Sequence, residues 1–78
     1  LSRAYQIFTQ GGYGIAVFEY TEIINLEPTR WAAYWMRAQT YSELREYEKA
    51  IADYKEAIKL DPEHAASYNN RGQSYRAL

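Results

Sequence analysis

The residues of this chain that could support catalysis or bind a metal ion are few. His64 is the only histidine among the 78 residues, and it follows Asp61-Pro62 in a predicted turn, where a histidine is ordinarily solvated. Cysteine is absent, so there is no thiolate nucleophile, no disulfide and no plausible ligand set for zinc. We expect no metal site and no cofactor.

Two further patterns can carry chemistry elsewhere but have structural explanations here. The segment Gly11-Gly12-Tyr13-Gly14 resembles a phosphate-binding loop, yet no strand precedes it and no Lys-Ser or Lys-Thr follows. We interpret it as a break between helices. Glutamates at 46, 48 and 56 could pair as acid and base, but nothing in the sequence indicates the burial that this would need. We therefore predict that the chain is not an enzyme.

Charge and composition exclude several classes of partner. The net charge is −1 and both signs are mixed along the chain, so there is no basic stripe for nucleic acid and no polybasic segment for anionic lipid. The sequence contains no run of about 18 apolar residues, the length that could span a membrane. Hydrophobic residues make up 47% of the chain, which predicts a folded domain. The absence of cysteine fits the cytosol without establishing it, and the start at Leu1 suggests a piece of a longer protein.

The elements that would position a site follow from an internal repeat. Glu27-Pro28 and Asp61-Pro62 each end an apolar helical stretch. A shift that places Pro28 on Pro62 gives a repeat of 34 residues (62 − 28 = 34). With that shift and no gap, like residues coincide along the chain: Arg3 with Arg37 and Arg71, Tyr13 with Tyr47, Ala16 with Ala50, Tyr20 with Tyr54, Ile24 with Ile58, Tyr34 with Tyr68, and Tyr41 with Tyr75. Repeats of this length are typical of stacked helical architectures.

Periodicity and helix breakers then predict five helices. Ala50, Tyr54, Ala57 and Ile58 recur with helical spacing and define an apolar stripe. Glycines at 11, 12 and 14 and prolines at 28 and 62 interrupt the helices. We predict helices over 1–10, 14–26, 30–44, 47–60 and 64–77, packed antiparallel because the connections are short.

Charged residues at helical spacing predict two solvated ion pairs in the fourth helix. Lys49 stands four residues before Asp53, and Glu56 stands three residues before Lys59. Such pairs contribute a few tenths of a kcal/mol each.

These features together resemble the tetratricopeptide repeat. The matching signature residues of the middle repeat are Tyr34, Ala38, Tyr41, Ala50, Tyr54, Ala57 and Pro62. The resemblance implies an all-α fold in which antiparallel helix-turn-helix repeats stack as a right-handed superhelical solenoid. It implies one domain over 1–78, with a partial repeat at 1–30, a full repeat at 31–64, and the first helix of a third repeat at 65–78. Arginines 3, 37 and 71 replace the usual leucine, and we expect their heads to reach solvent.

The resemblance also implies the function. First helices of tetratricopeptide hairpins line a concave groove that binds a peptide or partner protein, as part of a larger scaffold protein. The groove positions here include Leu1, Ser2 and Ala32, and the residues expected to contact a peptide are Tyr5, Phe8, Trp35, Met36, Gln39, Glu43, Asn69, Asn70, Gln73 and Arg76. The alternative for the aromatic residues, and for Trp35 and Met36 in particular, is that they pack between repeats.

The partner is not expected to be a chaperone tail. Tetratricopeptide domains that grip the C-terminal carboxylate of Hsp70 and Hsp90 use a clamp of lysine, arginine and asparagine. The matching positions here hold Leu1, Tyr5, Met36, Ala66 and Asn70, which supply no paired cations.

Self-assembly is the alternative function. An uncapped repeat leaves its stacking face open, and the final predicted helix would present Tyr68, Tyr75 and Leu78 without a capping helix. The sequence therefore leaves a homodimer joined through this end as the second hypothesis.

Overall fold

The computed structural model describes residues 1–63 as four α-helices. They are α1 (Ser2–Thr9), α2 (Tyr13–Leu26), α3 (Trp31–Glu43) and α4 (Tyr47–Leu60), and no strand occurs in these residues. The first four predicted helices are confirmed to within one residue at each end. The fifth, at 64–77, lies outside the described residues.

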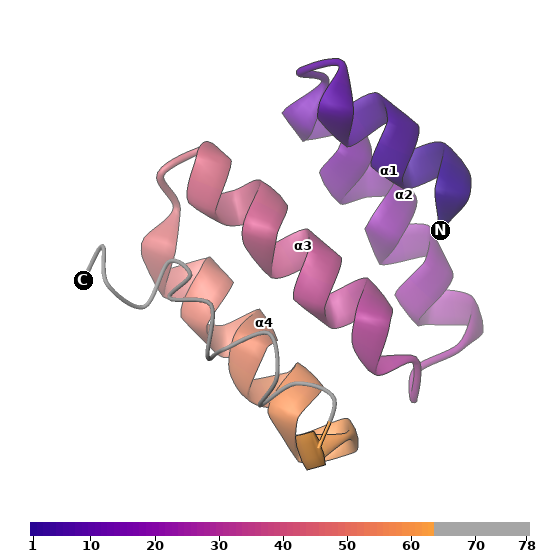
Figure 1. The fold of residues 1–78 in the computed structure, drawn as a ribbon, viewed down its shortest axis with the longest axis vertical. Helices are drawn as coiled ribbons and strands as arrows, with labels where there is room; N and C mark the ends of the chain where they lie inside the picture. Colours follow the sequence, from indigo (N-terminus) through magenta and orange to yellow (C-terminus); the bar gives the residue numbers. More distant parts are fainter. Residues whose placement is uncertain (64–78) are drawn as a thin grey trace.

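Consecutive helices lie side by side and run in opposite directions (Figure 1). Helix α1 packs against α2, α2 against α3, and α3 against α4. Short connections enforce this order, because each leaves the chain no room to place the next helix elsewhere. The result is two helical hairpins, α1–α2 and α3–α4, joined by the segment around Pro28.

Both hairpins turn through the same backbone motif. The amide of Gly12 donates to the carbonyl of Ile7 at 3.0 Å, and one repeat later the amide of Glu46 donates to the carbonyl of Tyr41 at 2.9 Å. Such bonds satisfy carbonyls left free at a helix C-terminus, and they need one residue with positive φ. That residue is Gly11 at 86° in the first turn and Arg45 at 62° in the second.

Each hairpin has its own buried cluster. In the first, Ala4, Ala16 and Tyr20 are buried together. In the second, the buried residues are Trp35, Ala38, Ala50, Tyr54 and Ala57. Three members of the predicted stripe on α4 are thus confirmed as core, and Met36 packs against both clusters.

The expectation that the head of Arg37 reaches solvent is wrong. Its Nε donates to Oδ2 of Asp53 at 2.7 Å and its Nη2 to Oδ1 at 2.8 Å, while Nη1 donates to Oγ1 of Thr21 at 3.1 Å. The side chain is 17% exposed because α2 and α4 flank it on both sides. For Arg3 the expectation is confirmed, and Arg71 lies outside the described residues.

The pair of Lys49 with Asp53 is also corrected. Asp53 is turned into the interface with α3, so Lys49 instead pairs with Glu46, at 2.8 Å. The pair of Glu56 with Lys59 is confirmed, at 4.0 Å.

Candidate functional site

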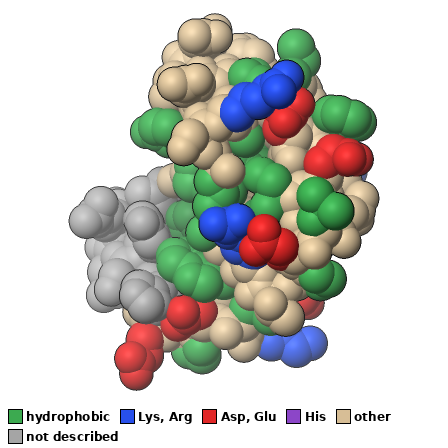
Figure 2. All heavy atoms as spheres, turned by 90° about the vertical axis from the view of Figure 1, so that its right-hand side faces the viewer, with side chains coloured by type: hydrophobic (Ala, Val, Ile, Leu, Met, Phe, Trp, Pro, Cys, Tyr) green, Lys and Arg blue, Asp and Glu red, His purple; other side chains and the backbone are tan. Residues whose placement is uncertain are grey.

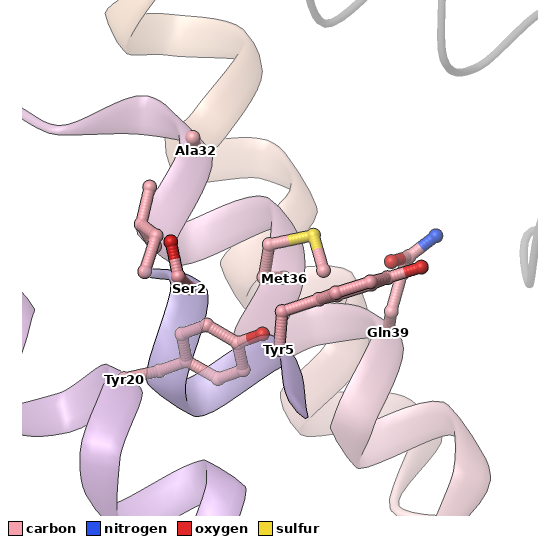
Figure 3. A pocket seen from close by; sticks show the side chains of 7 residues that line it. Ser2, Tyr5, Tyr20, Ala32, Met36 and Gln39 are labelled. Carbon is pink, nitrogen blue, oxygen red and sulfur yellow. The ribbon is translucent and has the colours of Figure 1, made fainter. Parts of the chain in front are cut away.

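An open pocket of about 510 Å³ lies between α1 and α3, with α2 beneath it (Figure 3). We call it the α1–α3 pocket. Its lining residues are Leu1, Ser2, Tyr5, Tyr20, Ala32, Met36 and Gln39. All of them except Tyr20 stand at positions that the sequence assigns to the groove. The size is within the usual range for ligand sites, roughly 300–1,000 Å³.

Helical spacing brings the pocket residues together. On α3, Ala32, Met36 and Gln39 follow one another at four and three residues, so their side chains lie on one stripe of the helix. On the facing side, Tyr5 lies one turn after Leu1, the N-cap residue of α1. The pocket therefore spans both hairpins, and its shape depends on how α1 and α3 are spaced across α2.

Tyr20 reaches the pocket from below and was missed as a site residue. It is fully buried, and its hydroxyl has no hydrogen-bond partner among the described residues. Burial, and then the nearby Tyr5, raise the pKa of Tyr20 to about 12. The repeat pattern marked it only as the counterpart of the core residue Tyr54, and no sequence signal distinguishes the two.

Tyr5 and Met36 lie over Tyr20 and form the apolar wall of the pocket (Figure 3). Tyr5 is 51% exposed and stacks on Phe8 with ring centroids 6.0 Å apart. Phe8 itself is turned toward Tyr13 of α2, at 5.5 Å, and does not line the pocket. Of the aromatic and Met residues expected to contact a peptide (Tyr5, Phe8, Trp35 and Met36), the structure brings Tyr5 and Met36 into one pocket.

The expectation that Trp35 faces the groove is wrong. Its side chain is 1% exposed and its ring meets that of Tyr54 edge-on, with centroids 4.5 Å apart. The small residues Ala38, Ala50 and Ala57 of the same cluster leave room for an indole between α3 and α4. The packing alternative therefore holds for Trp35. Met36 is partly buried against the clusters of both hairpins and also lines the pocket.

The remaining expected contacts do not add to the pocket. Glu43 is exposed at the end of α3 and is not among the lining residues. Asn69, Asn70, Gln73 and Arg76 lie outside the described residues.

Among the residues that the structure describes, no charged side chain lines the α1–α3 pocket. On the face drawn in Figure 2, basic and acidic side chains are interspersed with apolar ones rather than gathered by sign. The described residues contain no group of acidic or histidine side chains that could hold a metal ion. None of the helices in that part of the chain is long and apolar enough to cross a membrane. The pocket is thus suited to uncharged groups.

Comparisons with known proteins agree with the repeat pattern. A family model described as a TPR repeat matches residues 41–78. Hsp70-Hsp90 organizing protein 3 of Arabidopsis thaliana is 39% identical over 49 residues, which is 63% of this chain and 9% of that protein. The chain thus spans less than a tenth of the length of the curated relative it matches.

Proposed function

Because the chain belongs to the tetratricopeptide-repeat family, we propose that it is a protein-interaction module whose α1–α3 pocket binds a segment of a partner polypeptide. The observation that carries the proposal is the convergence of two kinds of group in one open pocket. Leu1, Tyr5 and Met36 supply apolar area, and Ser2 and Gln39 supply polar groups at its edge. Peptide sites combine these features, because apolar burial gives affinity and a few polar groups fix orientation.

The class of partner follows from the charge of the pocket. The Arabidopsis relative is named as an organizer of Hsp70 and Hsp90. In this chain the pocket positions that would hold a carboxylate clamp are Leu1, Tyr5 and Met36, and none of them has a cationic side chain. A chain-terminal carboxylate entering there would lose its hydration without gaining a cationic side chain from these positions. We therefore infer that the module, within a larger scaffold protein, takes an apolar segment and not a chaperone tail.

Self-association remains the second candidate, and one observation favours it. Ile15 and Phe18 on the outer side of α2 are 60% and 61% exposed, and Leu26 at its end is 82% exposed. Exposed apolar surface of this kind is a common feature of interfaces. The uncapped end that the sequence suggested for dimerisation lies outside the described residues.

A display selection followed by NMR tests the proposal. Random peptides displayed without a free C-terminus would be selected on the chain, and the single methionine would report binding through the methyl signal of Met36. We expect selected peptides to shift that signal saturably and Tyr5→Ala to weaken them by about tenfold, as truncation of a buried aromatic contact does.

Phe18→Ala is the matched control, since it truncates a similarly exposed aromatic residue that does not line the pocket. It should leave the affinity unchanged. Failure to select any peptide, or binding that leaves Met36 unmoved and is lost in Phe18→Ala, would contradict the proposal. Sedimentation at several concentrations then shows whether α2 joins two copies instead.

A further inference from the structure

We propose that Tyr20 is the specificity residue of the α1–α3 pocket, and that its hydroxyl donates a hydrogen bond to a backbone carbonyl of an uncharged, internal peptide segment. The inference rests on the proposed function and names the chemistry of the ligand. It concerns a residue of α2, the second helix of its hairpin, and not the groove positions of α1 and α3.

The first support is the state of the hydroxyl in the free protein. It is enclosed and has no hydrogen-bond partner among the described residues. A buried polar group without a partner raises the free energy of the folded state, and buried hydroxyls are nearly always paired. A ligand that supplies an acceptor removes this penalty on binding, so the penalty becomes a preference for ligands with a carbonyl at that point.

The second support is that the hydroxyl can be uncovered. Met36 packs against the cluster that contains Tyr20, and in Figure 3 the Tyr20 hydroxyl points toward the base of the Tyr5 side chain, whose ring extends toward Gln39. Tyr5 is half exposed, so its ring can turn toward solvent with little loss of buried area. Met36 has an unbranched and flexible side chain that adapts to a new neighbour. Both side chains would then pack against the apolar residues of the segment.

The third support is the charge of the surroundings. An uncharged phenol donates readily to a neutral carbonyl, and a tyrosine hydroxyl is uncharged at neutral pH because its ordinary pKa is about 10. Within residues 1–63, no lysine or arginine lines the pocket to stabilise an anion. The same geometry therefore selects an internal carbonyl and rejects a terminal carboxylate.

Two short peptides provide a defined test. One is acetyl-Ala-Leu-Ala amide, and the other is the same peptide with a free C-terminal carboxylate. Each is titrated up to about 10 mM, the range in which fragments of this size bind, while the Met36 methyl signal is followed. The amide should shift the signal saturably and bind at least about fivefold more tightly than the acid.

Tyr20→Phe should weaken the amide peptide by about tenfold, the usual effect of one lost hydrogen bond. The same variant should resist urea as well as the parent or better, because no hydrogen bond is lost from the free protein. Tyr54→Phe is the matched control, since it makes the same change one repeat later and outside the pocket. It should leave binding unchanged.

Replacing the amide bond after the leucine by an ester makes the leucine carbonyl a weaker hydrogen-bond acceptor. If Tyr20 bonds the leucine carbonyl, this change should weaken binding to the parent and have much less effect on Tyr20→Phe, which is the coupling a double-mutant cycle measures.

Equal binding of the amide peptide by the parent and Tyr20→Phe would overturn the inference about Tyr20. It would not contradict the proposed binding of a peptide in the pocket. Tighter binding of the acid, or no saturable shift with either peptide, would also overturn it. The display selection decides independently whether the pocket binds longer segments, so the two failures are distinguishable.

Discussion

At the scale of single residues, two equivalent arginines have different surroundings. Arg37 makes a two-pronged contact with Asp53, and its guanidinium lies 5.7 and 5.8 Å from the rings of Tyr34 and Tyr41. Arg3, one repeat earlier, is 81% exposed and lies 3.9 Å from Glu19, the repeat counterpart of Asp53. The difference arises because α3 packs against both α2 and α4, whereas among the described helices α1 packs mainly against α2.

The two ion pairs should therefore differ in their effect on stability. Arg37→Ala leaves the buried Asp53 carboxylate without its partner, and we expect the free energy of unfolding to fall by about 3 kcal/mol. Arg3→Ala, the matched control, should change it by less than about 0.5 kcal/mol, since an exposed ion pair contributes little. Urea unfolding of both variants measures the difference. Losses of similar size would show that the burial of the Arg37 pair has no energetic consequence.

The same two positions show what the sequence can and cannot predict. A shift by one repeat places equivalent residues in equivalent surroundings in some cases, since Ala4 and its counterpart Ala38 are both buried. The shift carries no information on how many neighbours a residue has. The burial of Arg37 and Trp35 and the unpaired hydroxyl of Tyr20 were not predictable for that reason, because each depends on packing across helices.

At the scale of elements, glycines and prolines mark most of the helix boundaries, and the turn between α3 and α4, which has neither, was predictable from the repeat. The first turn uses Gly11 at positive φ, and glycine adopts that conformation without steric conflict. The second turn places Arg45 at the same point, where a side chain clashes with the backbone. The backbone hydrogen bonds are the same in both turns, so the second turn keeps its shape at a conformational cost.

The two turns should respond oppositely to substitution. Arg45→Gly relieves the left-handed strain, and we expect it to raise the free energy of unfolding by about 0.5–1 kcal/mol after allowing for the added freedom of the unfolded chain. Gly11→Ala introduces the same strain and should lower it by about 1 kcal/mol. The midpoints of urea unfolding, compared at an unchanged m-value, give both numbers. A loss of stability in Arg45→Gly would show that the exposed arginine contributes contacts that outweigh the strain.

At the scale of the whole molecule, the two hairpins are unequally built. The second hairpin buries five residues in one cluster, including Trp35 and Tyr54. The first buries three, and α1 contributes only Ala4. Helix α1 is also short, at 8 residues. The wall of the α1–α3 pocket formed by α1 is therefore the less stable of its two sides.

This inequality predicts a gradient of hydrogen exchange that ligand binding should reduce. Local opening requires little free energy where few apolar contacts are broken. We therefore expect the amides of α1 to exchange faster than those of α3 and α4 in the free chain, as measured by NMR or mass spectrometry. A peptide held between α1 and α3 must be released before α1 can open, so its binding should slow exchange in α1 more than in α4. Equal protection of α1 and α4 in the free chain would contradict the gradient, and slowing confined to α2 would place the ligand on the outer face instead.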